Sequence, residues 1–168
     1  MRNLRVFIGI GFIFLFGSFA EETFDQMASK MGKGKAPFVK AIVLKEWMDL
    51  KKQVTILDTR EAKEFQTSHL PQAFHLGYDN FSLENSVKLF KKDEVIICYC
   101  SVGYRSQKIA EKLLNAGYKK VYNLYGGIFN WVNLGYEIVD AKGEKTNRVH
   151  AYNKDWGKWL VKGEKVFN

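Results

Sequence analysis

The strongest chemical signal in this 168-residue sequence is a segment that combines a cysteine, a glycine, an arginine and two serines. It reads Cys100-Ser101-Val102-Gly103-Tyr104-Arg105-Ser106. A thiolate is a nucleophile, and backbone N–H groups that curl around it at a helix N-terminus favour the anionic form. Gly103 permits a tight or left-handed backbone, and Arg105 supplies a permanent cation with a planar fork for oxyanions. The segment therefore predicts nucleophilic chemistry at Cys100 on an anionic substrate.

The second cysteine of the sequence, Cys98, lies two positions before Cys100. In an extended strand the two Cβ atoms would be roughly 6–7 Å apart, whereas a disulfide needs about 3.8 Å. We therefore expect two free thiols, with Cys98 as a small buried hydrophobe. Two cysteines and three scattered histidines (His69, His75 and His150) offer no metal-ligand spacing, so we expect neither a metal nor another cofactor.

Apolar runs and amphipathic runs alternate through the central part of the chain. The predicted strands cover 54–57, 95–99 and 121–124, and the predicted helices cover 43–50, 61–67, 85–90, 106–116 and a short stretch from 127. This alternation is typical of an α/β domain with a mainly parallel sheet that is buried on both faces. Ligands of such sheets bind at the carboxyl ends of the strands, which is where residues 100–106 fall.

These residues resemble a known family. Cys100-x-x-Gly103-x-Arg105-Ser106 is similar to the active-site loop of the rhodanese (thiosulfate sulfurtransferase) family. Three further segments resemble the family in order and spacing: 56–61 with Asp58 and Arg60, 68–73, and the double-glycine and tryptophan segment 126–131. The resemblance covers roughly 39–139, although Ser68 and Gln72 stand where the family usually has glycines. It implies a single rhodanese-like domain over 38–140, with a mainly parallel central sheet flanked by helices.

The resemblance implies a sulfurtransferase. Cys100 would take a sulfane sulfur from a small anionic donor (thiosulfate or a persulfide) and hold it as a persulfide. A thiol, cyanide or a thiol-bearing partner protein would then remove it. The amides of Ser101, Val102, Gly103, Tyr104, Arg105 and Ser106 would bind the charged sulfur, and Arg105 would hold the donor's sulfonate or brace the loop. Asp58 and Arg60 are expected to support the site as an ion pair, and His69 to be structural.

Two other functions remain open from the sequence. Related cysteine phosphatases place one residue more between Cys and Arg, so the shorter spacing here favours sulfur over phosphate or arsenate. A non-catalytic member of the family would instead present a sulfur or redox signal to a partner. Replacing Cys100 with alanine separates the classes, because a binding module keeps its partner affinity whereas a sulfurtransferase loses turnover.

The amino-terminal residues differ in composition from the centre of the chain. Residues 1–20 have early arginines, an apolar run and small residues near Ala20, a pattern typical of a secretory signal peptide. The apolar run is shorter than the roughly 20 residues that span a bilayer. We expect cleavage near Ala20, export to the periplasm or the cell exterior, and no stable membrane anchor afterwards. Residues 21–37 are polar and predict a loose arm.

The carboxyl-terminal residues 141–168 form a basic, aromatic extension with seven Lys and Arg residues against three acids, in a chain of net charge +8. Trp156, Trp159 and Leu160 are spaced as one stripe of a helix, so we expect a helix that packs its aromatic side chains back on the domain. Basic residues among aromatic ones also suit nucleic acid, but an exported chain makes such a partner unexpected. The 46% hydrophobic content excludes a disordered chain.

Overall fold

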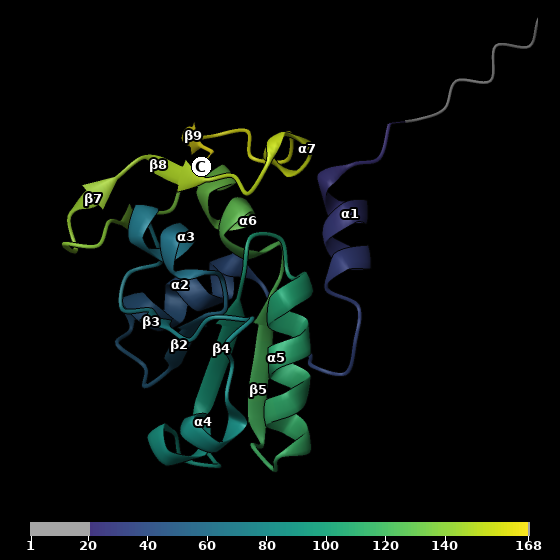
Figure 1. Cartoon of the computed structure of the whole chain (residues 1–168), viewed down its shortest axis with the longest axis vertical. Helices are drawn as coiled ribbons and strands as arrows, with labels where there is room; N and C mark the ends of the chain where they lie inside the picture. Colours follow the sequence, from purple (N-terminus) through teal and green to yellow (C-terminus); the bar gives the residue numbers. More distant parts are fainter. Residues whose placement is uncertain (1–20, 168) are drawn as a thin grey trace, which may run out of the picture.

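A five-stranded parallel sheet forms the centre of the computed structural model, which describes residues 21–167 (Figure 1). The strands are β1 (Phe38–Val39), β2 (Thr55–Asp58), β3 (Phe74–His75), β4 (Val95–Tyr99) and β5 (Lys120–Leu124), in the order β1-β5-β4-β2-β3. Every pairing in this sheet is parallel. The predicted fold class, α/β with a mainly parallel central sheet, is confirmed. The predicted signal peptide, residues 1–20, lies outside the described residues.

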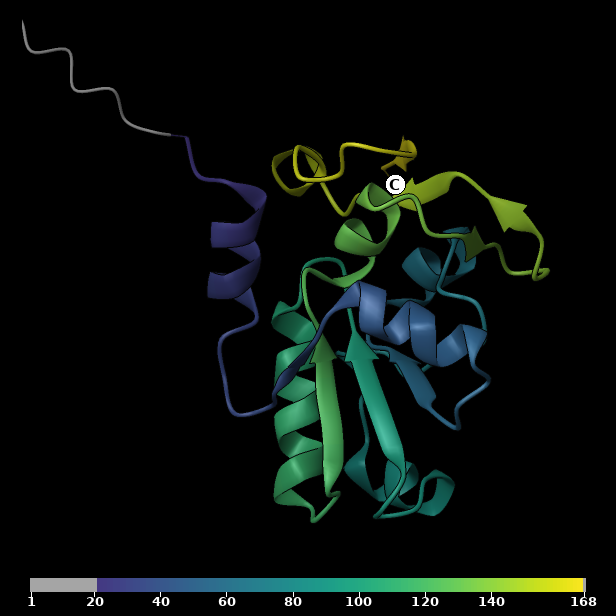
Figure 2. The same cartoon turned by 180° about the vertical axis from the view of Figure 1, so that it is seen from behind.

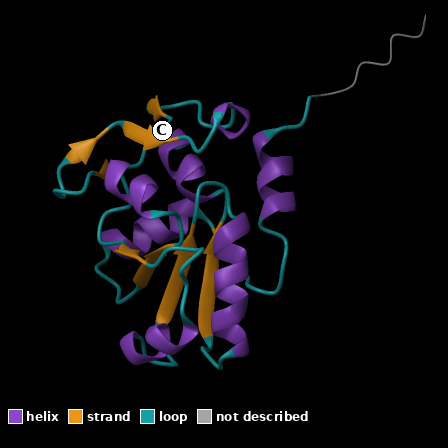
Figure 3. Ribbon diagram, viewed as in Figure 1, coloured by secondary structure: helices purple, strands orange, loops and turns teal. Residues whose placement is uncertain are grey.

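Helices cover both faces of the sheet, as Figure 3 shows by colour. They are α2 (Ala41–Asp49), α3 (Ala62–Thr67), α4 (Leu83–Leu89), α5 (Tyr104–Asn115) and α6 (Gly127–Asn133). Figure 1 shows α5 in front of the sheet, and Figure 2 shows α2 on the opposite face. Because side chains alternate along a strand, Ile96 and Cys98 of β4 pack in the cluster that includes α5, whereas Ile97 and Tyr99 pack in the cluster that includes α2 and α6.

The amino-terminal arm is not loose, which corrects the prediction for residues 21–37. Residues Phe24–Met31 form helix α1, and Thr23 and Gln26 make a capping box at its start. Met27 and Ala28 are buried against the core, and the Tyr125 hydroxyl donates to Asp25 Oδ1 at 2.7 Å. The capping pair therefore stabilises the helix, and its apolar face and the bond from Tyr125 hold this arm on the domain.

The carboxyl-terminal extension forms short elements rather than the predicted amphipathic helix. They are β7 (Lys145–Thr146), β8 (Arg148–His150), the single turn α7 (Lys154–Gly157) and β9 (Glu164–Val166), and β6 (Ile138–Val139) directly precedes the extension. The two-residue β6 and β7 pair antiparallel, and β8 pairs with β9 in parallel. Gly157 ends α7, and Gly163 has a left-handed φ of 87°, so the chain turns where a helix would continue.

The extension nevertheless packs back on the domain, as expected. Val149, Ala151 and Leu160 are fully buried in the cluster that also contains Ile97 and Phe129. Figure 1 shows the yellow segment crossing above α3 and α6, at the end of the sheet where β4 finishes. Within residues 21–167, none of the helices has the length and apolar character needed to cross a membrane.

Candidate active site

Cys100 immediately follows β4, at the carboxyl end of the sheet, and its side chain is buried. The chain turns back on the sulfur at Gly103, whose φ of 112° is left-handed. This turn directs the Gly103 N–H to the Cys100 Sγ atom at 3.1 Å, and the Ser106 hydroxyl lies 3.5 Å from the same sulfur. The start of α5 at Tyr104 adds its positive end to this environment. The loop therefore provides donors for an anionic sulfur.

Asn123 of β5 fixes both groups that face the sulfur. Its Oδ1 atom accepts from the Ser106 hydroxyl at 2.7 Å, and its Nδ2 atom donates to the Gly103 carbonyl at 2.9 Å. A serine has one hydroxyl proton, so the shorter contact makes Asn123 its acceptor and leaves the Gly103 amide as the main donor to sulfur. The sequence prediction missed Asn123, although a polar residue inside an otherwise apolar strand was the available signal.

The amino end of α6 holds the first carbonyl groups of the loop. Ile128 N donates to the Cys100 carbonyl at 2.9 Å, and Phe129 N donates to the Ser101 carbonyl at 3.1 Å. Gly127 has a left-handed φ of 56°, and a Cβ atom there would collide with the Cys100 carbonyl oxygen. The double glycine of the 126–131 segment therefore lets this helix approach the loop closely.

A buried ion pair braces the loop from α3. Glu64 accepts two hydrogen bonds from the Arg105 guanidinium, at 2.6 and 2.8 Å, and the Ser101 hydroxyl donates to Glu64 at 3.2 Å. Burial raises the pKa of Glu64, but the hydrogen bonds and charge of Arg105 outweigh it, so this pKa lies below its ordinary value. Of the two roles expected for Arg105, the geometry provides the bracing one, because its fork already holds a carboxylate.

Asp58 and Arg60 form the expected ion pair beneath the site, between side chains that are fully buried. The Arg60 Nη2 atom lies 2.6 Å from Asp58 Oδ2 and also donates to the Ser68 carbonyl. The Tyr99 hydroxyl donates to the same Asp58 oxygen at 2.6 Å. These groups connect the end of β2 with the end of β4 and do not line the cavity at Cys100.

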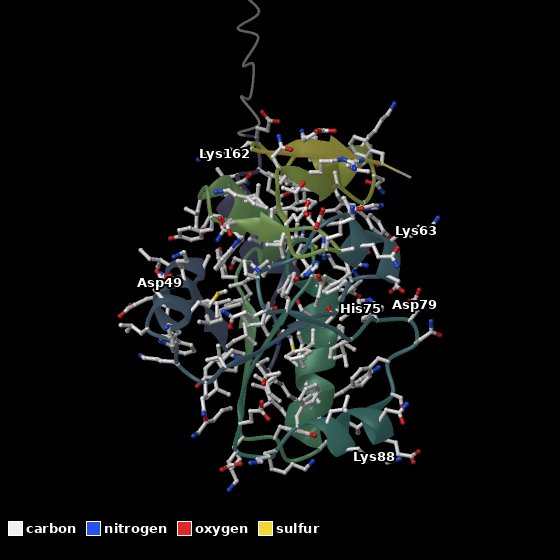
Figure 4. The ribbon with its side chains drawn as sticks, turned by 90° about the vertical axis from the view of Figure 1, so that its left-hand side faces the viewer. Asp49, Lys63, His75, Asp79, Lys88 and Lys162 are labelled. Carbon is white, nitrogen blue, oxygen red and sulfur yellow. The ribbon has the colours of Figure 1, made fainter. Side chains whose placement is uncertain are left out.

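The cavity above Cys100 has a volume of about 350 Å³. Five of its lining residues were not predicted as site residues. Three lie outside the helices and strands of the central domain, and two belong to the carboxyl-terminal extension: Glu61, Tyr78 and Asp79, and Tyr152 and Trp156. Figure 4 shows Asp79 on the side of the molecule where His75 also lies. Of the loop residues, Ser101, Tyr104 and Arg105 also line it, as does Val102, whose side chain packs in the core.

Cys98 and His69, for which the sequence predicts structural roles, are held by packing and hydrogen bonds away from the reacting sulfur. Cys98 is fully buried and not bonded to Cys100, and burial raises the pKa of its thiol, which keeps it protonated. The His69 ring stacks on Phe65 with ring centroids 3.8 Å apart, and its Nδ1 atom lies 3.0 Å from the Phe65 carbonyl. Across the part of the chain that the structure describes, no group of three or more His, Cys, Asp or Glu side chains is arranged to hold a metal ion.

The chain is similar in sequence and in structure to proteins that carry different names. The thiosulfate sulfurtransferase GlpE of Coxiella burnetii is 35% identical over 89 residues, which are 52% of this chain and 81% of that protein. A tRNA uridine(34) hydroxylase of Burkholderia lata is 30% identical over 118 residues, 65% of this chain and 42% of that protein. The crystal structure of a rhodanese-related protein from Thermoplasma volcanium matches with a TM-score of 0.54 and 26% identity, covering 61% of this chain and 97% of that one.

The family assignment follows from the match to a family model. The sequence model of the rhodanese-like domain matches residues 41–134, which contain the whole Cys100 loop, the Asp58–Arg60 pair and the double glycine. This span is more than half of the chain, so the protein belongs to the family of rhodanese-like domains.

Proposed function

We propose that this protein is a sulfurtransferase that carries a sulfane sulfur as a persulfide on Cys100. The observation that supports this most is the position of the Cys100 Sγ atom, which faces a cavity of about 350 Å³ and receives the Gly103 N–H at 3.1 Å. A backbone N–H that donates a hydrogen bond to sulfur stabilises the sulfur anion. The similarity to a thiosulfate sulfurtransferase supports the same reaction class.

In the first step the Cys100 thiolate attacks the outer sulfur of a small anionic donor, thiosulfate or a persulfide. With thiosulfate, a bond forms between Cys100 Sγ and that sulfur while the S–S bond of the donor breaks. The electron pair of the broken bond leaves with sulfite, so the step needs no external oxidant or reductant. The product is a Cys100 persulfide, whose outer sulfur carries the negative charge.

In the second step a thiolate or cyanide attacks the outer sulfur of the persulfide. The Sγ–S bond breaks, its electron pair returns to Cys100 as a thiolate, and the acceptor leaves as a persulfide or as thiocyanate. Because the two substrates react in turn with one sulfur atom, the kinetics are expected to be ping-pong. A thiol on a partner protein fits the same chemistry, provided that it reaches the cavity.

The surrounding residues position the reacting sulfur. The Gly103 N–H stabilises the negative charge, while Glu64 and Arg105 hold the loop in its curled form. Asn123 keeps the Ser106 hydroxyl and the Gly103 carbonyl in place, so that the Gly103 N–H stays directed at the sulfur. Asp58 and Arg60 support the neighbouring strand end and take no part in the transfer.

A steady-state assay with thiosulfate and cyanide tests the proposal. We expect parallel double-reciprocal plots, thiocyanate formation, and a gain of one sulfur atom on Cys100 in intact-mass spectra after treatment with thiosulfate alone. Cys100→Ala should abolish both signals. Cys98→Ala is the matched control, since Cys98 lies two residues away on the buried face of β4, and it should keep both. Thiocyanate formation that persists in Cys100→Ala would contradict the proposal, as would a wild-type protein that never gains sulfur.

Export to the periplasm or the cell exterior is also part of the proposal, on the evidence of residues 1–20. The mature protein should then begin near Glu21, with no stable membrane anchor. Amino-terminal sequencing of the protein from fractionated cells tests this directly. Recovery of the full-length chain with Met1 from the cytosolic fraction would contradict it.

A further inference from the structure

The cavity at Cys100 has an aromatic wall, and part of this wall lies outside the family match. Tyr152 and Trp156 belong to the carboxyl-terminal extension, beyond the matched residues 41–134, and they line the same cavity as Tyr78 and Tyr104. We call these four residues the aromatic wall. Tyr104 and Tyr152 are each about half exposed (51% and 52%), so their rings are available to a bound molecule.

Tyr152 is held in place at a conformational cost. Its φ of 65° is left-handed, a region that glycine or asparagine adopts more readily than tyrosine. The preceding residue, Ala151, is fully buried, and Tyr152 N donates to His150 Nδ1 at 3.2 Å, which fixes the backbone that leads into Tyr152. The result is a tyrosine ring that lies over the Arg105 guanidinium, with 5.3 Å between the ring centroid and Cζ. A strained residue whose side chain enters a cavity points to a role there.

The charges around the cavity favour an acceptor with an uncharged body over one with an anionic body. The Arg105 guanidinium is already neutralised by Glu64, and Tyr152 covers it. Glu61 and Asp79 add two carboxylates to the lining. An acceptor whose body carries carboxylates is therefore repelled by these side chains, whereas an acceptor with an uncharged body is not. The volume of about 350 Å³ lies in the range of small-molecule sites, roughly 300–1,000 Å³, and leaves room beside the sulfur for more than an inorganic ion.

We propose that the aromatic wall selects the acceptor: an organic thiol of low molecular weight with an uncharged aromatic or apolar body. This inference rests on the proposed sulfurtransferase function and names the acceptor class. The acceptor thiolate attacks the outer sulfur of the Cys100 persulfide, the new S–S bond forms on the acceptor, and the electron pair of the broken bond returns to Cys100. The body of the acceptor packs between the Tyr152, Trp156 and Tyr104 rings while its sulfur reaches the loop.

Discharge of the loaded enzyme tests the acceptor class. The Cys100 persulfide is formed with thiosulfate, verified by mass, and mixed with benzyl mercaptan, 2-mercaptoethanol or mercaptosuccinate. Each rate constant is divided by that of the same thiol with a small disulfide in free solution, which removes differences in intrinsic reactivity. Because the benzyl ring gains aromatic contacts that 2-mercaptoethanol lacks, benzyl mercaptan should react about tenfold faster than 2-mercaptoethanol, with mercaptosuccinate slowest.

Variants separate the effect of the aromatic wall on acceptor preference from an effect on folding. Tyr152→Gly relieves the left-handed strain, so it should keep the unfolding temperature while the preference for benzyl mercaptan falls to about twofold or less. Trp156→Leu should also reduce the preference. Val161→Ala is the matched control, because Val161 is 75% exposed in the same extension and does not line the cavity. Equal normalised rates for the three thiols in the wild type, or an unchanged preference in both wall variants, would overturn the proposal.

A ligand that binds but cannot react tests the aromatic wall separately from the sulfurtransferase function. Benzyl methyl sulfide has the same body as the best acceptor and no reactive thiol, and its binding is followed by the indole N–H resonance of Trp156. We expect a saturable shift in the wild type that is absent from Tyr152→Gly. No shift at all counts against the aromatic wall, whereas a Cys100 that never gains sulfur counts against the sulfurtransferase function.

Discussion

Glu64 is the side chain on which two residues of the Cys100 loop depend. It accepts from both Arg105 nitrogens and from the Ser101 hydroxyl, and its side chain is only 3% exposed. Glu64→Gln keeps the shape and some hydrogen bonds but leaves Arg105 without its counter-charge. Breaking a buried pair costs up to about 3–5 kcal/mol, and the remaining hydrogen bonds and the partial exposure of Arg105 reduce our expectation to about 1–3 kcal/mol. Urea denaturation at neutral pH measures this loss.

The difference in free energy of unfolding between the wild type and Glu64→Gln should also depend on pH. The folded-state pKa of Glu64 is lowered, so its contribution to stability is fully present above the ordinary glutamate pKa of about 4.3. It is lost as the pH falls through the lower folded-state pKa, because the protonated carboxyl no longer pairs with Arg105. The stability difference between wild type and Glu64→Gln should therefore be constant from pH 5 to 7, roughly, and shrink at lower pH. A difference that grows with acid would contradict the ion-pair account.

Gly127 should be among the least replaceable residues near the site. Alanine there meets a left-handed φ and also collides with the Cys100 carbonyl oxygen. We expect a loss of about 2–5 kcal/mol from the sum of the two effects, together with slower persulfide formation because α6 is displaced from the loop. Gly143→Ala is the control for conformation alone, since its φ is 80° and nothing lies within 4 Å of the new Cβ. Equal losses in chemical denaturation of the two variants would show that the close approach of α6 is unimportant.

Helices and strands with strong internal patterns were predictable from the sequence, and segments held by distant contacts were not. The uncharged, β-branched run 95–99 is β4 to the residue, whereas α5 starts at Tyr104 rather than the expected Ser106, because left-handed Gly103 begins it. The carboxyl-terminal extension shows the limit. Its aromatic spacing suited a helix, but Asn153 and Gly157 confine α7 to a single turn, and the position of Tyr152 depends on a left-handed backbone that spacing does not encode.

Within the candidate site, the predicted and the missed residues differ in the same way. The Cys100 loop and the Asp58–Arg60 pair are local in sequence, so motifs reveal them. Asn123 and the extension residues Tyr152 and Trp156 reach the site from elements that are distant in the chain, and only the fold brings them together. Glu64 is intermediate, because it lies in a recognisable segment but its partner is 41 residues away.

The attachment of α1 gives a prediction for this element. The Tyr125 hydroxyl donates to Asp25 at 2.7 Å, and Phe24 packs edge-on against Trp159 of the extension. Tyr125→Phe should weaken α1 docking by about 0.5–1.5 kcal/mol and leave the central sheet unaffected. Hydrogen exchange should therefore accelerate in α1 amides and stay unchanged in β4 amides. Uniform acceleration across both elements would mean that α1 unfolds only with the whole domain.

The same contact predicts a pH dependence at alkaline pH. Burial, followed by the hydrogen bond to Asp25, raises the pKa of Tyr125 to about 12. A raised folded-state pKa means that the stabilisation is fully present below the ordinary tyrosine value of about 10 and is lost as the pH rises through about 12. The NMR signal of the Tyr125 ring carbon that bears the hydroxyl should titrate near the higher value in the wild type. Asp25→Asn should bring it back towards the ordinary one.

The folded unit of the whole molecule extends beyond the family match. The matched residues end at 134, yet Val149, Ala151 and Leu160 of the extension are fully buried in the same core cluster as the sheet. The extension therefore contributes to the stability of the domain as well as to the wall of the cavity. The composition of residues 141–168 indicates only a basic segment, because its charged residues outnumber the three apolar residues that are buried in the core.

Leu160 and its neighbour Val161 test whether the extension belongs to one cooperative unit. Leu160 is fully buried, so Leu160→Ala should lower the free energy of unfolding by about 2–5 kcal/mol. Val161 is 75% exposed, and Val161→Ala should change it by no more than about 0.5 kcal/mol. If the molecule unfolds as one unit, Leu160→Ala shifts the transition of a probe in the central sheet by the same amount as one in the extension. A shift confined to the extension would instead make it a separately unfolding flap, and the aromatic wall would then open without disturbing the Cys100 loop.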